Sequence, residues 1–317
     1  MLQAISQFDP RAWLRRCDLN LAPLRYERVL RRDGGPIEHL ERMTVAVREG
    51  PLHNVNAFLA EGLKPMKGEA TDFYSNADGG GTHALELVAR FKAISEAIER
   101  WAFWDRVESA GRDLFGFDIE PSTTGMAAFP GLLQERARHT ARLEALERFA
   151  LLHWWEGRLP HRLERGVEGM QVVEILLPTR EACAVIVFED DVALGTRHYG
   201  YGAGDDYGDA VARAHGEMIR HRLTVGRFVR RFPDPAMGLV TLRNGDERRS
   251  FYFALREGRQ LFDDRLAEGP WGAPARLRQV FDGWIPGAWN RYATVWRCLF
   301  EPPSDDHLGD RGDYFFW

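Results

Sequence analysis

The segment Ser95-Glu96-Ala97-Ile98-Glu99-Arg100-Trp101-Ala102 recurs further along the chain as Leu143-Glu144-Ala145-Leu146-Glu147-Arg148-Phe149-Ala150. Both copies follow the pattern Glu-Ala-aliphatic-Glu-Arg-aromatic-Ala. An internal repeat defines architecture more firmly than local propensity does, because each copy must form the same structural unit. We therefore expect two related helices and, around them, a fold built from two related halves.

The sequence around both repeats has the helical period, since alanines and aliphatic residues return every three or four positions. A glycine-bearing turn precedes each of the two segments, and a third segment begins in the same way. Three glycine-containing turns should therefore lead into three helices. The expected helices are 85–103, 132–155 and 208–228, and the turns contain 79–81, Gly125 and 200–204.

Short runs rich in β-branched and aromatic residues fill the intervals and predict strands. Asn244-Gly245 is typical of a hairpin turn between two of the late runs. We expect an α+β fold with layered mixed sheets and packed helices around a central cleft. The whole chain is taken as one domain, with 1–50 as an N-terminal extension, 51–230 as the core that carries the three helices, and 231–317 completing the sheet. The expected strands are 43–48, 170–177, 182–188, 238–242, 251–255 and 293–300.

The composition is that of a globular protein, with 44% hydrophobic and 28% charged residues among 317. The net charge is −5 and the basic residues are dispersed, which argues against duplex nucleic acid as the main partner. Cys17, Cys183 and Cys298 lack the spacing of a zinc site or a disulfide framework. No apolar run approaches the roughly 20 residues that cross a bilayer. These features predict a cytoplasmic protein that does not enter a membrane.

The repeated glutamates indicate a cation site. Glu96 and Glu99 are three residues apart, as are Glu144 and Glu147, so each pair projects from one face of its helix. A like-charge pair destabilises a helix unless a cation compensates it, and Mg²⁺ prefers one or two carboxylates together with substrate phosphates. A solvated helix face, on which the arginine offsets the acids, is the alternative for a single copy. The repetition and the neighbouring aromatic residues favour the cation site.

Three motifs in this order resemble the YcaO family: Gly79-Gly80-Gly81 with Glu96-x-x-Glu99-Arg100, then Thr124-Gly125-Met126-Ala127-Ala128 with Glu144-x-x-Glu147-Arg148, then Glu217 with Arg222. The resemblance implies that ATP lies in a cleft with its phosphates held through Mg²⁺. It also implies a peptide substrate whose backbone amide oxygen is phosphorylated after a nucleophile has added to the carbonyl. By position, the metal ligands would be Glu96, Glu99, Glu144, Glu147 and Glu217, and the phosphate contacts Arg148 and Arg222.

Azoline formation from a substrate Cys, Ser or Thr is the first expectation, and a thioamide formed with a TfuA-type partner is an alternative. No separate peptide-capturing domain is recognised, so the resemblance implies an E1-like or ocin-ThiF partner, or the TfuA-type protein, that delivers the precursor peptide. Whether the chain forms a homodimer stays open.

Three residues depart from the family pattern: Thr82 replaces a lysine, and Lys92 and Arg136 stand at positions usually small and acidic. Lys92 and Arg136 could either supply the missing positive charge or block the nucleotide pocket. The departures leave a non-catalytic scaffold as an alternative. A kinase or ligase of another fold is the more distant one.

Overall fold

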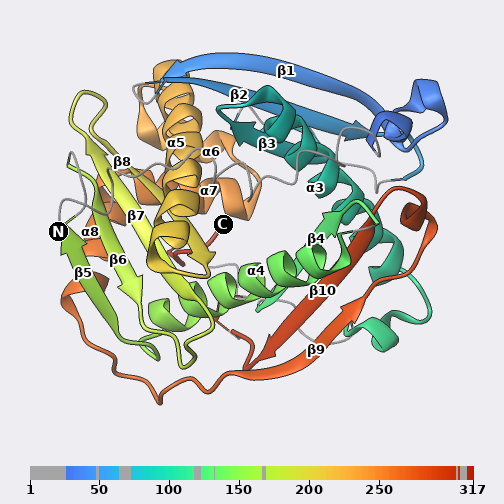
Figure 1. Ribbon diagram of the computed structural model, residues 1–317. Coiled ribbons are helices and arrows are strands. Elements are labelled where there is room, and N and C mark those ends of the chain that lie inside the picture. The colour runs from blue at the N-terminus through green and yellow to red at the C-terminus, as the bar shows by residue number, and fades with distance from the viewer. Residues whose placement is uncertain are drawn as a thin grey trace.

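Three antiparallel sheets, each covered by one long helix, form the fold of the computed structural model (Figure 1). The structure describes residues 26–47, 50–63, 73–117, 123–131, 133–165, 169–304, 306–307 and 313–317. Cys17 and residues 1–25 of the expected N-terminal extension lie outside the described residues. The sheets have the strand orders β1-β2-β3, β4-β10-β9 and β5-β6-β7-β8.

The bounds are as follows. The strands are β1 Ile37–Val47, β2 Gly50–Leu59, β3 Gly79–His83, β4 Thr124–Phe129, β5 His161–Arg165, β6 Gln171–Ile175, β7 Cys183–Asp191, β8 Thr196–Gly204, β9 Arg278–Trp284 and β10 Thr294–Glu301. The α-helices are α3 Glu86–Val107, α4 Gln134–Trp155, α5 Tyr207–Arg231, α6 Pro235–Thr241, α7 Gly245–Ala254 and α8 Arg256–Ala267.

The three predicted long helices are confirmed as α3, α4 and α5, but the glycine segments before them are strands rather than turns. In each strand a glycine lies directly against the helix that follows. A Cβ atom on Gly79 would lie 2.1 Å from the carbonyl oxygen of Ala93, and one on Gly125 would lie 2.0 Å from that of Ala141. Glycine is therefore required for close approach of strand and helix and not for a turn.

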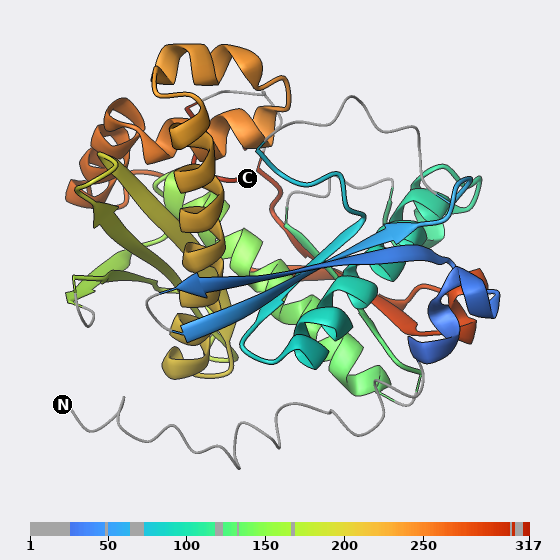
Figure 2. The ribbon, with the colours of Figure 1, turned by 90° about the horizontal axis from the view of Figure 1, so that it is seen from above.

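The same contact defines a third strand–helix unit, because a Cβ on Gly200 of β8 would lie 2.0 Å from the carbonyl oxygen of Ala214 in α5. The chain thus contains three related units, β3–α3, β4–α4 and β8–α5. Figures 1 and 2 show the three helices grouped in the middle of the molecule with their sheets around them. Helix α4 joins two of the sheets, since it packs on β4 and β10 and also contacts β8.

The two larger of four hydrophobic clusters among the described residues support this arrangement. One lies between α3 and the sheets that contain β2 and β4, and includes Ile98, Trp101 and Trp289. The other surrounds α4 and the sheet of β5–β8, and includes Trp154 and Phe262. The last residues of the chain pack into the second core, where the side chain of Phe315 is fully buried.

The predicted strands at 238–242 and 251–255 are wrong, because these segments belong to helices α6 and α7. Asn244 is not part of a hairpin turn. Its side-chain oxygen accepts hydrogen bonds from the backbone N–H groups of Asp246 and Glu247, which is the N-cap arrangement of a helix. Asp234 caps α6 in the same way, with Pro235 in the first turn.

The expected N-terminal extension and the expected C-terminal part both contribute strands to the sheets. β1, which lies within the expected extension, pairs with β2 along its whole length. β10, from the C-terminal part, lies between β4 and β9. Within the described ranges, no helix combines the length and the apolar character that a membrane span requires.

Candidate functional site

The first two units present a glutamate in the same way. Glu96 Oε2 accepts a hydrogen bond of 2.8 Å from the backbone N–H of Gly80, and its Oε1 accepts one of 2.9 Å from Arg100. Glu144 Oε2 accepts a bond of 3.1 Å from the N–H of Met126, and its Oε1 accepts one of 2.7 Å from Arg148. In both units the donor strand residue follows the glycine that packs on the helix.

The third unit carries a different set of side chains at equivalent positions. By the glycine contacts, Glu217 corresponds to Glu96 and Glu144, while Arg220 takes the place of the second glutamate and His221 that of the arginine. His221 Nδ1 accepts from the N–H of Tyr199, and Nε2 donates to the carbonyl oxygen of Ser250. Burial lowers the pKa of His221 to about 3, so this position is neutral.

The second glutamates, Glu99 and Glu147, lie where the units meet. Burial, followed by the neighbouring charges of Glu144 and Glu217, raises the pKa of Glu147 to about 8. Its Oε2 also accepts a 3.0 Å hydrogen bond from the N–H of Ala203 in β8. Burial and the charges of Glu144 and Glu96 raise the pKa of Glu99 well above its usual range. The structure therefore brings all five predicted glutamates into one electrostatic cluster.

The raised pKa values of Glu99, Glu144 and Glu147 indicate that a cation bound at the cluster would favour the charged forms of these carboxylates. Burial together with Glu96 also raises the pKa of Glu144, against the opposing effect of Arg148. Among the described residues, no group of three His, Cys, Asp or Glu side chains converges closely enough to bind one ion without further ligands. The donors nevertheless fit Mg²⁺, which needs only one or two carboxylates when phosphate oxygens and water complete its shell.

The two predicted arginines have different surroundings. Arg148 pairs with Glu144, and its guanidinium lies 6.0 Å from the ring centroid of Phe316. Arg222 donates to Glu189 of β7 at 3.3 Å. It is not one of the described residues that line the adjacent cavity, whereas Arg220 is.

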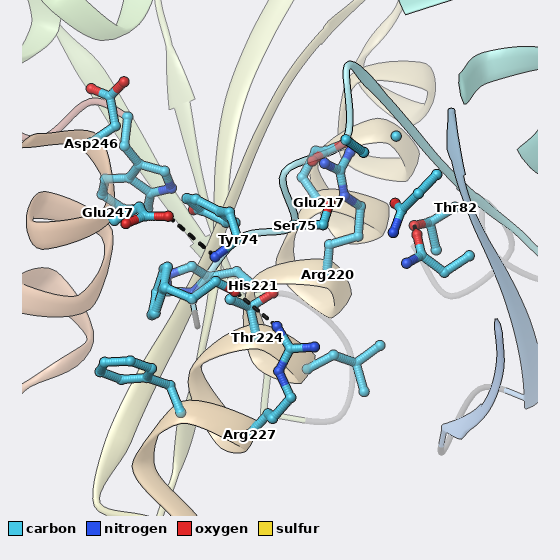
Figure 3. A pocket seen from close by; sticks show the side chains of 18 of the residues that line it. Tyr74, Ser75, Thr82, Glu217, Arg220, His221, Thr224, Arg227, Asp246 and Glu247 are labelled. Carbon is cyan, nitrogen blue, oxygen red and sulfur yellow. Dashed lines mark hydrogen bonds and ion pairs between the residues drawn. The ribbon is translucent and has the colours of Figure 1, made fainter. Parts of the chain in front are cut away.

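A cavity of about 1450 Å³ opens beside the cluster (Figure 3). Glu96 and Glu217 both line it, although Glu99, Glu144 and Glu147 are not among its described lining residues. The sheet of β1–β3 contributes polar groups such as Thr82, which donates a 3.0 Å hydrogen bond to the side-chain oxygen of Asn54. Further lining residues come from α3, β8 and α5, from residues 73–77, from residues 241–247 and from Trp317.

The departures from the family pattern lie in different places. Thr82 lines the cavity, but Lys92 and Arg136 are exposed on α3 and α4 and are not among the described residues that line it. Lys92 therefore does not block this cavity. It instead affects His83, whose pKa falls to about 4 through burial and then through the charge of Lys92.

Several lining residues lie outside the predicted set of site residues. Tyr199 and Tyr201 lie in the third glycine segment, and both line the cavity. Arg220 was missed, although comparison of Glu217-x-x-Arg220-His221 with the two Glu-x-x-Glu-Arg repeats contains the signal. No sequence feature indicated Tyr74, whose backbone N–H donates to Glu247 on α7 at 3.3 Å.

A solved structure shares this fold. A heterocyclase in complex with substrate and cofactor has a TM-score of 0.54 at 12% identity, over 94% of this chain and 55% of that chain. The chain therefore spans about half the length of the heterocyclase. YcaO from Methanopyrus kandleri, bound with AMPPCP and Mg²⁺, gives a TM-score of 0.48 at 13% identity, over 92% and 90% of the two chains. No protein-family model and no curated protein matches the sequence. The likeness to the heterocyclase confirms the predicted fold.

Proposed function

We propose that this chain is a YcaO-type enzyme that uses ATP and Mg²⁺ to activate a backbone amide of a peptide. The observation that carries the proposal is the threefold use of one unit. Three glutamates, Glu96, Glu144 and Glu217, occupy equivalent positions on three central helices, and two of them face a large cavity. Such a cluster suits a polyphosphate bound through metal ions, because the five glutamates of the cluster repel each other and weaken the binding of a metal-free anion.

In the proposed site, Glu96, Glu99, Glu144, Glu147 and Glu217 hold Mg²⁺, and Arg148 neutralises the phosphates with it. ATP would supply the phosphoryl group that turns the amide oxygen into a good leaving group, and Mg²⁺ would hold and neutralise its phosphates. The residues of the chain then have to position the reacting groups and neutralise the charge of the phosphates, since phosphoryl transfer needs little covalent chemistry from the protein. Arg220, which lines the cavity, is a further proposed phosphate contact beside Arg148 and Arg222. Arg222 also pairs with Glu189 of β7.

The peptide is the proposed second substrate, and the cavity has room for it. Typical small-molecule pockets measure about 300 to 1,000 Å³, which is less than the 1450 Å³ found here. We place azoline formation from a Cys, Ser or Thr of a ribosomally made precursor peptide first. A cytoplasmic partner of the E1-like, ocin-ThiF or TfuA type would present that peptide.

The test is the binding of MgATP by isothermal titration calorimetry, with Glu217→Gln against Glu135→Gln. Glu217 lines the cavity and is about half exposed, so its replacement should leave the fold intact. Glu135 is exposed in the first turn of α4 and serves as the matched control. We expect Glu217→Gln to weaken MgATP binding about 10- to 100-fold, the range for losing a residue that supports a metal site. Equal affinities in both variants would contradict the proposed site.

The reaction is tested by mass spectrometry of a candidate peptide after incubation with the protein, its partner and MgATP. Loss of one water from the peptide indicates an azoline, and exchange of oxygen for sulfur indicates a thioamide. A wild-type chain that binds no MgATP, and leaves every peptide unchanged, would support the non-catalytic scaffold instead.

A further inference from the structure

The third strand–helix unit differs from the other two in its charge. Each of the first two units has two glutamates and an arginine, whereas the third has Glu217, Arg220 and the neutral His221. The backbones correspond closely, because the glycine of each strand contacts the same two turns of its helix. Arg220 therefore stands where the other units place a half-buried glutamate, at the point where the units face each other.

Arg220 is directed at the carboxylates of two units. Its Nη1 donates to Glu217 Oε1 at 2.9 Å, and both side chains are nearly half exposed in the cavity, at 44% and 46%. The charge of Glu217 raises the pKa of Arg220, burial lowers it, and the charge of Glu96 on α3 raises it further. Figure 3 shows Arg220 and Glu217 next to each other on α5. The guanidinium thus pairs with a carboxylate of α5 and lines the same cavity as Glu96 of α3, whose charge acts on it.

A guanidinium offers several N–H donors in a planar fork, so it can bind a carboxylate and a phosphate oxygen at the same time. Its charge is present without any metal. In the first two units, by contrast, the arginine pairs with its own helix at i+4, and the second glutamate adds negative charge. The third unit alone places a cation at the position of that second glutamate.

We propose that Arg220 is a phosphate-positioning residue, which binds the triphosphate directly and lowers the need for metal in the third unit. This inference rests on the proposed function. Loss of the guanidinium should change the affinities for ATP and for divalent metal in opposite directions. Removal of the guanidinium should weaken the binding of ATP without metal. It should strengthen the binding of divalent metal without ATP, because Glu217 and Glu96 lose their internal counter-charge.

The experiment uses the full chain with Arg220→Gln, Arg220→Lys and Arg213→Gln. Arg213 is an exposed arginine of the same helix that is not among the described residues lining the cavity, so its variant is the matched control. ATP binding is measured calorimetrically in EDTA, and Mn²⁺ binding without nucleotide is followed by electron paramagnetic resonance. We expect Arg220→Gln to bind ATP about tenfold more weakly in EDTA and Mn²⁺ several-fold more tightly. Arg220→Lys should lie between this variant and the wild type.

A purely structural role would move both affinities downward together, and this result would overturn the proposal. Unchanged affinities, or wild-type protein that binds no ATP in EDTA, would also overturn it. Failure of the proposed function looks different. In that case wild-type protein binds no ATP even with Mg²⁺, while the Mn²⁺ measurement still reports whether Arg220 acts as the counter-ion of Glu217 and Glu96.

Discussion

The first two strand–helix units and the third share one backbone arrangement but carry different charges. In β3–α3 and β4–α4 the helix presents two acids and an arginine, whereas β8–α5 presents one acid, an arginine in the place of the second acid, and a neutral histidine. Packing of a glycine strand against an alanine-containing helix is common to all three. The packing contact thus maintains the fold in all three units. The side chains that face the centre differ between the units, and they define the chemistry of each one.

The largest effect is expected from the shared packing contact. Gly79→Ala, Gly125→Ala and Gly200→Ala each place a Cβ within about 2.1 Å of a helix carbonyl oxygen, at 2.1, 2.0 and 2.0 Å. Because backbone rather than a flexible side chain must move, we expect each to lower the free energy of unfolding by about 3 kcal/mol or more. Urea unfolding measures this loss. If one of the three substitutions lowers the free energy of unfolding much less than the other two, the three units are not equivalent.

Gly216→Ala is the matched control for that series, because nothing lies within 4 Å of the Cβ that it adds on α5. An alanine in an exposed helix should stabilise the protein by about 0.5 to 1 kcal/mol relative to glycine. A stabilised Gly216→Ala beside destabilised strand variants would separate helix propensity from close packing.

The second largest effect concerns Glu147, whose equivalent position in the third unit is occupied by Arg220. The pKa of Glu147 is raised to about 8 in the folded chain and is near 4.5 when unfolded. Its charge therefore costs nothing below the unfolded value and progressively destabilises the fold as the pH rises from about 4.5 to 8. Without metal, Glu147→Gln should stabilise the protein by about 1 to 3 kcal/mol at pH 8 and scarcely at all near pH 4.

Thermal unfolding of wild type, Glu147→Gln and the exposed control Glu135→Gln at both pH values gives this comparison directly. If Glu147→Gln stabilises the protein equally at pH 4 and pH 8, the charge of the Glu147 carboxylate is not what destabilises the wild type. Addition of Mg²⁺ and ATP should narrow the difference at pH 8, since bound cations favour the charged carboxylate.

The smallest effect distinguishes the two similar units from each other. The Arg100–Glu96 pair is more exposed, with side chains at 49% and 33%, than the Arg148–Glu144 pair at 35% and 28%. Water screens the first pair more, so Arg100→Gln should cost at most about 0.5 kcal/mol of unfolding free energy. Arg148→Gln should cost more, about 1 to 3 kcal/mol, because it removes the partner of buried acids. Chemical denaturation measures both, and the reverse order would contradict the predicted difference in screening.

Much of the site could be predicted because its residues belong to a local repeat. The pattern around Glu96 and Glu144 has the helical period, and the glycine before each helix marks a close contact even though its strand was interpreted as a turn. α6 and α7 were missed because short runs such as 251–255 are rich in aromatic residues, which fit either a buried helix or a strand. Asn244 accordingly suggested a hairpin and is instead a helix cap.

The position of Arg222 could not be predicted from its spacing alone. Its direction depends on Glu189, which lies on a strand far away in the sequence and is paired with it only in the folded chain. Arg220 stands at the repeat position of Glu99 and Glu147 in the sequence, and the helix contacts of Gly200, Gly125 and Gly79 establish that the three positions are equivalent. Tertiary contacts thus decide which arginines of α5 line the cavity, as Arg220, Arg227 and Arg230 do.

The most direct test of the central claim is anomalous diffraction from crystals grown with Mn²⁺ and a non-hydrolysable ATP analogue. The account predicts Mn²⁺ peaks within about 2.0 to 2.6 Å of carboxylate oxygens from the cluster of Glu96, Glu99, Glu144, Glu147 and Glu217, with the triphosphate in the adjoining cavity. Anomalous peaks and nucleotide density located elsewhere, with these five carboxylates still held only by their arginines and backbone N–H groups, would contradict it.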